Sequence, residues 1–135
     1  MKLRNELEPI RDWAEKKGIY KKGDLKTQFL KLQEESGELA KAILNDDEEE
    51  VIDAIGDCVV VLTSIAELAK MKYRNECKTC LGKGVYFNKQ YVTKCNDCRS
   101  GELGPLTIEN CINTAYNVIS KRKGKMINGT FVKDK

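Results

Sequence analysis

Histidine is absent from the 135 residues of this chain, and proline occurs only twice. Without an imidazole, neither a Ser-His-Asp nor a Cys-His nucleophile can form, and an HExxH zinc protease is excluded as well. The sequence also lacks the GxxxxGKS/T loop that wraps phosphates in P-loop proteins. Proton transfer near neutral pH must therefore fall to carboxylates, lysine, cysteine, tyrosine or metal-bound water, and phosphate binding to metals and basic side chains.

Long apolar runs are missing too. The longest, from Cys58 to Leu62, is far shorter than the roughly 20 residues that a membrane span needs. The first residues, MKLRNELEPIRDW, carry charges where a secretory signal has its apolar stretch. Since 41% of the residues are hydrophobic and 33% are charged, we expect one compact domain, with at most a small insertion, in a soluble intracellular protein.

Charge is divided unevenly along the chain. Residues 1–70 hold 11 basic and 16 acidic residues, net −5, whereas residues 71–135 hold 13 and 5, net +8. Acidic residues concentrate between Glu34 and Asp57, and basic residues in the segment KRKGK at 121–125. Two interpretations stay open at this point: solvated faces that keep the protein soluble, or a divalent-metal site that faces a grip for polyphosphate.

Four segments have the apolar spacing of amphipathic helices. The first covers about residues 3–17, from Leu3 to the glycine cap at Gly18, and the second covers about 24–44 with Asp24 as its N-cap. The third follows an acidic turn and ends at about residue 71, and the fourth is expected over about 105–122. Their number and aliphatic content predict an all-α helical bundle that forms an oligomer.

The apolar faces of the second and third helices are the most extensive. The residues that we expect in the core are Leu25, Phe29, Leu32, Leu39 and Ile43 on the second helix, and Val51, Ile55, Cys58, Leu62, Ile65 and Ala69 on the third. Cys58, and Cys111 on the fourth helix, are interpreted as small core residues.

The other four cysteines form two CxxC pairs separated by fourteen residues: Cys77 with Cys80, and Cys95 with Cys98. Zn²⁺ prefers four tetrahedral thiolates, and a β-hairpin predicted from the runs at 85–87 and 91–93 would bring the pairs together. Such a site has no open position, so we predict a structural Zn²⁺ that stabilises the segment. Disulfides are the alternative, which a reducing compartment disfavours.

The cysteine segment has two further features, a likeness to a known type of zinc finger and an excess of basic residues. Its first half, CKTCLGKG, resembles the CxxCxGxG repeat of DnaJ-type zinc fingers, which the second half keeps only in part. Basic residues make nucleic-acid contact one possible role: Lys78, Lys83, Lys89, Lys94 and Arg99.

Near the C-terminus, Asn128-Gly129 between apolar runs predicts a second hairpin.

Carboxylates cluster on two of the expected helices. At 100° per residue, Glu35 and Glu38 lie together on the shoulder of the second helix's apolar stripe, and Glu50, Asp53 and Asp57 share one side of the third. Like charges at these spacings repel, so a fold keeps them at little cost only where water or a cation screens them. Facing helices would form an oxygen-rich site suited to Mg²⁺ or Mn²⁺, whereas an exposed acidic surface is the other interpretation.

The acidic segments EESGEL at 34–39 and DAIGD at 53–57 resemble the ExxE and ExxD motifs of MazG-like all-α nucleoside triphosphate pyrophosphohydrolases. The likeness extends to Trp13-Ala14, to Gln28 with LKL, and to AY, RKGKM and NG near the C-terminus. It is strongest for the small phage-encoded members. It implies a MazG-like helical domain formed by residues 1–72 and 105–135, with residues 73–104 as a zinc-binding insertion.

The resemblance implies hydrolysis of an NTP or dNTP to the monophosphate and pyrophosphate, in the host cytoplasm if the chain is phage-encoded. By motif, Glu35 and Glu38 match the first metal-binding pair, and Asp57 matches the final aspartate. Ala54 stands where the family has glutamate, and Asp53 or Glu50 could replace it.

The primary hypothesis is therefore metal-assisted phosphoryl transfer. Mg²⁺ held by Glu35, Glu38, Asp53 and Asp57 would activate a water that Glu34 or Glu35 orients toward the α-phosphorus. Candidate phosphate-binding residues are Lys31, Lys121, Arg122 and Lys125. Asn117 could bond to the nucleotide, and Trp13 either stacks on the base or packs in the core.

The partners that we expect are a nucleoside triphosphate and further copies of the chain, in a homodimer or homotetramer. A different class stays open: a zinc-knuckle module that binds nucleic acid, or proteins in the manner of DnaJ, without catalysis. In that case the helices would only form the oligomer.

Overall fold

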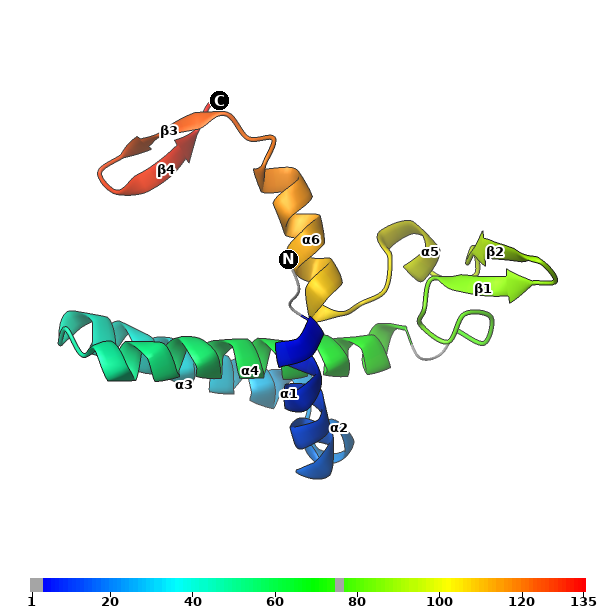
Figure 1. Cartoon of the computed structure of the whole chain (residues 1–135), viewed down its shortest axis with the longest axis horizontal. Coiled ribbons are helices and arrows are strands. Elements are labelled where there is room, and N and C mark those ends of the chain that lie inside the picture. The colour runs from blue at the N-terminus through cyan, green and yellow to red at the C-terminus, as the bar shows by residue number, and fades with distance from the viewer. Residues whose placement is uncertain (1–3, 75–76) are drawn as a thin grey trace.

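The computed structural model describes residues 4–74 and 77–135, and it is mostly helical (Figure 1). Its elements, in chain order, are α1 (Arg4–Lys16), α2 (Ile19–Lys22), α3 (Leu25–Leu44), α4 (Glu48–Tyr73), β1 (Val85–Asn88), β2 (Tyr91–Lys94), α5 (Ser100–Leu103), α6 (Ile108–Ile119), β3 (Gly124–Ile127) and β4 (Thr130–Lys133). The predicted class, all-α with a small hairpin insertion, is confirmed. The expected helix start at Leu3 lies outside the described residues.

Side-chain caps set the starts of α3 and α4 where the sequence predicts them. Asp24 accepts a hydrogen bond from the backbone N–H of Thr27 at the start of α3, and Asp47 accepts one from Glu50 at the start of α4. The fourth predicted helix begins later than expected, at Ile108 rather than near Pro105. The reason is that the Thr107 hydroxyl accepts from the backbone N–H of Asn110 and thereby fixes the first turn.

The antiparallel pair α3–α4 is the main packing unit, and α1 crosses α4 near its C-terminal half (Figure 1). Ala42 on α3 and Ala54 and Val61 on α4 are buried, and Leu7 and Ala14 bury α1 against the rest. Small side chains at these positions let the two long helices approach each other closely. None of the helices within residues 4–74 and 77–135 is long and apolar enough to cross a membrane.

The inward faces of α3 and α4 differ from the predicted ones. Phe29 and Ile43 on α3, and Ile55 and Leu62 on α4, are exposed within one chain, while Glu35 is buried. Periodicity alone misplaces these residues because each helix is apolar on more than one side. The contact with α3 covers only the side of α4 that carries small residues.

A charged network fixes α6 to the helical core. Arg11 on α1 lies 3.2 Å from Glu67 on α4, 2.5 Å from Glu109 on α6 and 2.6 Å from Glu8. Burial opposes ionisation of Glu109, but hydrogen bonds from the Arg11 guanidinium, from its own backbone N–H and from the Thr107 hydroxyl, together with the charge of Arg11, outweigh burial and lower its pKa. Arg11 therefore links three helices whose sequence positions lie far apart.

Both predicted hairpins are present. Tyr86 pairs with Thr93 in the β1–β2 hairpin, and Met126 pairs with Phe131 in the β3–β4 hairpin, whose turn is Asn128-Gly129. Beyond Asn110, every residue to the C-terminus is exposed. The C-terminal arm, defined as residues 111–135, thus leaves the core as α6 and ends in an uncovered hairpin (Figure 1).

Candidate active site and cysteine cluster

A cavity of about 310 Å³ lies where α3 and α4 pack beside α1. It contains two of the predicted carboxylates, together with the predicted lysine and tryptophan. Its lining consists of Trp13, Ile19, Thr27, Gln28, Lys31, Glu35, Asp57, Val60, Val61 and Ser64. We call it the Glu35 pocket.

Glu35 is the most unusual residue of this pocket, because it is a carboxylate with only 5% of its surface exposed. Its Oε1 lies 2.7 Å from Lys31 Nζ, which also lies 3.2 Å from Glu34 Oε1. Hydrogen bonds to Glu35 and then to Glu34 raise the pKa of Lys31. The other oxygen, Glu35 Oε2, is buried and has no hydrogen-bond partner.

Unbalanced negative charge surrounds Glu35. The pKa of Asp57 is raised by burial first and then by the charges of Asp53 and Glu35. The pKa of Glu38, which is fully exposed, is raised chiefly by the charge of Glu35. The single lysine therefore does not neutralise the group, and a cation would relieve the repulsion.

Glu38 and Glu50 line a second hollow of about 500 Å³, one turn further along the helix pair. The lining residues are Glu38, Lys41, Ala42, Asn45, Asp47 and Glu50. Ala54 stands where the resemblance implies a glutamate, and it is buried. Along α4 it lies between Glu50 of the second hollow and Asp57 of the Glu35 pocket. Asp53 is exposed and acts on the site through its charge on Asp57.

The predicted carboxylates therefore share one side of the α3–α4 pair but are divided between two hollows. Over the described residues, their oxygens do not come within 4.8 Å of one another as a group of three or more. An open arrangement of this kind leaves room for water and a substrate between the oxygen donors.

The four predicted zinc ligands, in contrast, do converge. The Sγ atoms of Cys77, Cys80, Cys95 and Cys98 all lie within 4.8 Å of one another. The distances are 3.6 Å between Cys77 and Cys95, and 3.5 Å between Cys80 and Cys98. Four sulfurs around Zn²⁺, at about 2.3 Å each, stand about 3.8 Å apart. The cluster could therefore hold a metal ion such as zinc.

The surroundings of the cysteine cluster favour thiolates unequally. The neighbouring hydroxyl and backbone N–H of Ser100 lower the pKa of Cys98 to about 6, whereas burial raises the pKa of Cys95 to about 12. Ser100 belongs to α5, a short helix that the sequence did not predict. A Cβ on the next residue, Gly101, would lie 1.7 Å from the carbonyl oxygen of Cys95, so only glycine fits there.

The basic candidates of the C-terminal arm lie elsewhere. Lys121, Arg122 and Lys125 follow α6, and Asn117 lies within it, all of them exposed. In Figure 1, α6 runs away from the α3–α4 pair. No residue of the C-terminal arm, which the structure describes in full, lines the Glu35 pocket. Within one chain, Lys31 is therefore the only predicted cation among the described residues of that pocket.

Among the polar residues of the pocket, Thr27 and Ser64 were neither predicted as functional nor part of the family resemblance. Thr27 belongs to the first turn of α3, where its backbone N–H donates to the Asp24 cap. Ser64 is 1% exposed and lies two turns after Asp57 on the same side of α4. A spacing of seven from a motif residue is the signal that could have identified Ser64.

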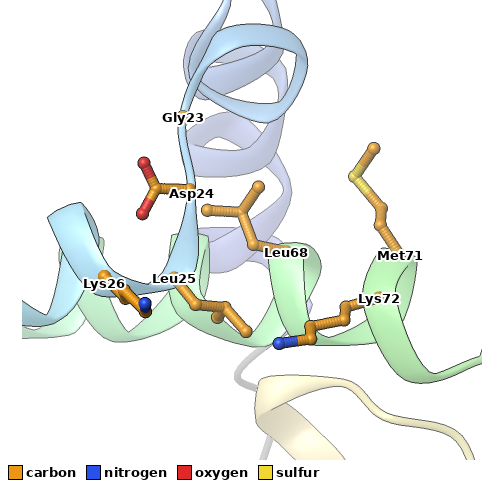
Figure 2. Close-up of a pocket in the computed structure, with 7 residues that line it drawn as sticks. All are labelled: Gly23, Asp24, Leu25, Lys26, Leu68, Met71 and Lys72. Carbon is orange, nitrogen blue, oxygen red and sulfur yellow. The ribbon is translucent and has the colours of Figure 1, made fainter.

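A further groove contains none of the predicted site residues. It lies between the α2–α3 junction and the C-terminal half of α4 (Figure 2). Leu25, Leu68 and Met71 supply its apolar surface, and Lys26 and Lys72 flank Leu25.

Comparison with known proteins finds similarity over the segment that contains the helix pair α3–α4. Residues 24–83 match the sequence model of the MazG nucleotide pyrophosphohydrolase domain. A similar protein is an uncharacterized 18.2 kDa protein from the rep-hol intergenic region of Haemophilus phage HP1, 34% identical over 65 residues. The match covers 48% of this chain and 40% of that relative, so the chain spans about two fifths of its length. No solved structure matches the chain. Over residues 24–83, which contain α3 and α4, the chain is thus similar to the MazG nucleotide pyrophosphohydrolases.

Proposed function

We propose that the chain is a divalent-metal-dependent pyrophosphohydrolase, which cleaves an NTP or dNTP to the monophosphate and pyrophosphate. The observation that carries the proposal is Glu35: a carboxylate buried between α3 and α4, with one oxygen that no donor satisfies, beside Asp57 in a pocket. The similarity of residues 24–83 to MazG domains supports the reaction class.

The donor set fits Mg²⁺ or Mn²⁺, because both prefer carboxylate oxygens. Glu35, Glu38 and Asp57 would hold the cation, with Asp53 or Glu50 as a further ligand. A buried carboxylate oxygen without a partner is costly, and a cation at Glu35 Oε2 would remove that cost. When bound, the metal would neutralise phosphate charge and acidify a water.

The remaining pocket residues have separate roles. Glu34, Glu35 or Glu38 would orient the attacking water toward the α-phosphorus, a task that needs no histidine. Lys31 would bind phosphate oxygens, because its ammonium lines the Glu35 pocket 2.7 Å from Glu35 Oε1. Trp13 is half exposed in the pocket lining and would stack on the nucleotide base.

We further propose that a second copy completes the site, in a homodimer or homotetramer. On α4, Ile52, Ile55, Val59 and Leu62 form a stripe that the described chain leaves exposed. Gly56 lies beside this stripe with no atom within 4 Å of an added Cβ. A mid-helix glycine costs about 1 kcal/mol relative to alanine, which the close approach of another helix would offset.

Charge complementarity indicates what the second copy would bring. The acidic side of α3–α4 is complementary to the basic arm, and the apolar residues of α6 match the exposed stripe. Docking of the arm there would carry Asn117, Lys121, Arg122 and Lys125 of one copy toward the Glu35 pocket of the other. The phosphates would then lie between metal and basic groups.

The cysteine cluster would hold a structural Zn²⁺, and residues 73–104 would form an insertion in a helical domain of residues 1–72 and 105–135. Sulfur spacing near that of a tetrahedral site supports zinc. Four thiolates leave no position for substrate, so this metal would stabilise the insertion rather than catalyse. The likeness to DnaJ-type fingers stays a prediction, and the cytoplasm is the compartment that would keep the thiols reduced.

The direct test is release of pyrophosphate from a panel of canonical and modified nucleoside triphosphates in the presence of Mg²⁺. Glu38→Gln and Asp57→Asn should lose turnover while keeping helical content and bound zinc. The exposed variant Glu49→Gln, which removes the same charge from the first turn of α4, should stay active. If no triphosphate yields pyrophosphate, the chain is a binding module instead.

The shared site has its own test. Glu38→Gln and the double variant Lys121→Gln/Arg122→Gln should each be inactive alone. Mixing them should restore part of the activity, because a mixed dimer contains one intact combination of pocket and arm. Absence of any recovery in a mixture shown to exchange subunits would contradict a site built from two copies.

A further inference from the structure

The β1–β2 hairpin presents an uncovered face. By its register, Val85 pairs with Lys94 and Phe87 with Val92, so these four side chains share one face. Phe87 is 83% exposed, although a phenylalanine usually packs against other residues. Tyr86 and Thr93, on the opposite face, are half-buried. Figure 1 shows the hairpin beyond the C-terminal end of α4, away from the α3–α4 turn.

The charge of the hairpin has one sign. Residues 81–96 include Lys83, Lys89 and Lys94 and no acidic residue. The two acidic residues at the base of the cluster are engaged locally. Asp97 accepts a hydrogen bond from the Thr79 hydroxyl, and Glu102 lies 3.6 Å from Arg99. The hairpin lysines therefore stand around exposed rings without a carboxylate of their own segment to neutralise them.

We propose that the β1–β2 hairpin binds single-stranded nucleic acid. Phe87, on the uncovered face, would stack on an unpaired base, while Lys83, Lys89 and Lys94 bind the phosphates. Tyr91, with 74% of its surface exposed, lies at the tip on the opposite face and would stack on a further base of a strand that passes around the tip. Stacking on a protein ring needs a base whose face is free, which favours a single strand over a duplex. DNA and RNA offer the same two groups, base faces and phosphates.

This inference goes beyond the proposed hydrolysis, because none of the hairpin residues lines the Glu35 pocket or the hollow beside it. Binding and turnover are therefore separable. A hairpin variant should keep pyrophosphate release, and a Glu35 pocket variant should keep binding to nucleic acid.

The test uses the full chain purified with zinc, and fluorescence anisotropy with labelled oligo-dT and oligo-rU at several salt concentrations. Three lysines on a single strand predict a slope of log affinity against log salt of about −2. Phe87→Ala should weaken binding at least about fivefold. The double variant K89Q/K94Q should make the slope shallower by about 1.4. The ratio of the two oligonucleotide affinities assigns DNA or RNA.

The matched control is K16Q/K17Q, which removes two exposed charges at the end of α1. It should leave the affinity, the slope and pyrophosphate release unchanged. The proposal is overturned if wild type shows no salt-dependent binding, if duplex binds as well as single strand, or if K16Q/K17Q acts like K89Q/K94Q. It is also overturned if Phe87→Ala leaves oligonucleotide binding intact. Dissociation of the oligomer by Phe87→Ala would overturn it too, because Phe87 would then pack between copies of the chain. Binding of an unfolded polypeptide in place of the oligonucleotides would assign the hairpin to proteins instead.

Discussion

The two clusters of potential metal ligands in this chain are built in opposite ways. Four sulfurs of the cysteine cluster lie within 4.8 Å of one another, whereas the carboxylates of α3 and α4 are divided between two hollows. The sulfur donors come from the two ends of a local hairpin, and the oxygen donors from two long helices. A closed donor set suits a metal that holds a fold together, and an open one suits a metal that a substrate shares.

Breaking the sulfur cluster should have the largest effect. Cys95→Ser removes a buried ligand, and binding of structural zinc is worth on the order of 10 kcal/mol. We expect zinc content to fall from one ion per chain to nearly none, and residues 77–104 to become sensitive to protease. Helical content should persist, because the helices α1, α3 and α4 pack with one another. Cys111→Ser, at an exposed position, is the control and should keep its zinc.

Removing a charge from the oxygen cluster should have a smaller effect on structure and a large one on turnover. Glu35→Gln keeps the shape of the side chain but removes the buried negative charge. Loss of a transition-state electrostatic contact of this kind costs about 100-fold in rate or more. We expect millimolar Mg²⁺ to raise the melting temperature of wild type but not of Glu35→Gln, with zinc unchanged in both. An equal shift in both would place the metal elsewhere.

The smallest effect concerns repulsion within the oxygen cluster. Because the pKa of Asp57 is raised, the folded chain holds its proton more tightly than the unfolded chain does, and stability from this group is lost as pH rises through the raised value. Asp57→Asn should therefore have a higher free energy of unfolding than wild type at neutral pH without divalent metal, by about the few tenths of a kcal/mol that like-charged helix neighbours cost. The difference should shrink near pH 4. A variant that is destabilised at neutral pH would contradict the repulsion.

Helix boundaries followed from the sequence because their signals are local. Asp24 and Asp47 cap their helices by bonds to residues three positions away, and Asn128-Gly129 forms the expected turn. The short helices α2 and α5 were missed, since four residues carry no periodicity. Spacing alone also brought the four cysteines together correctly, because a hairpin has one way to align its ends.

Inward orientation was the harder property to predict. Glu35 was placed on the shoulder of an apolar stripe, yet it is buried, and Phe29 is exposed. Helical periodicity ranks faces by apolar content, whereas the actual contact selects the faces with small residues such as Ala42 and Ala54. The carboxylate pair Glu35 and Asp57 was found by motif and resemblance; its enclosure depended on helix packing that no single segment specifies.

The Arg11 network gives α6 a fixed origin, and this has a mechanical consequence. Glu109 anchors the first turn, and a helix of 12 residues rises about 18 Å from there. The length of α6 therefore sets the distance between Lys121 and the helical core. Adding or deleting one turn in the exposed part of α6, after Asn110, would change that reach by about 5 Å and leave the Arg11–Glu109 contact in place.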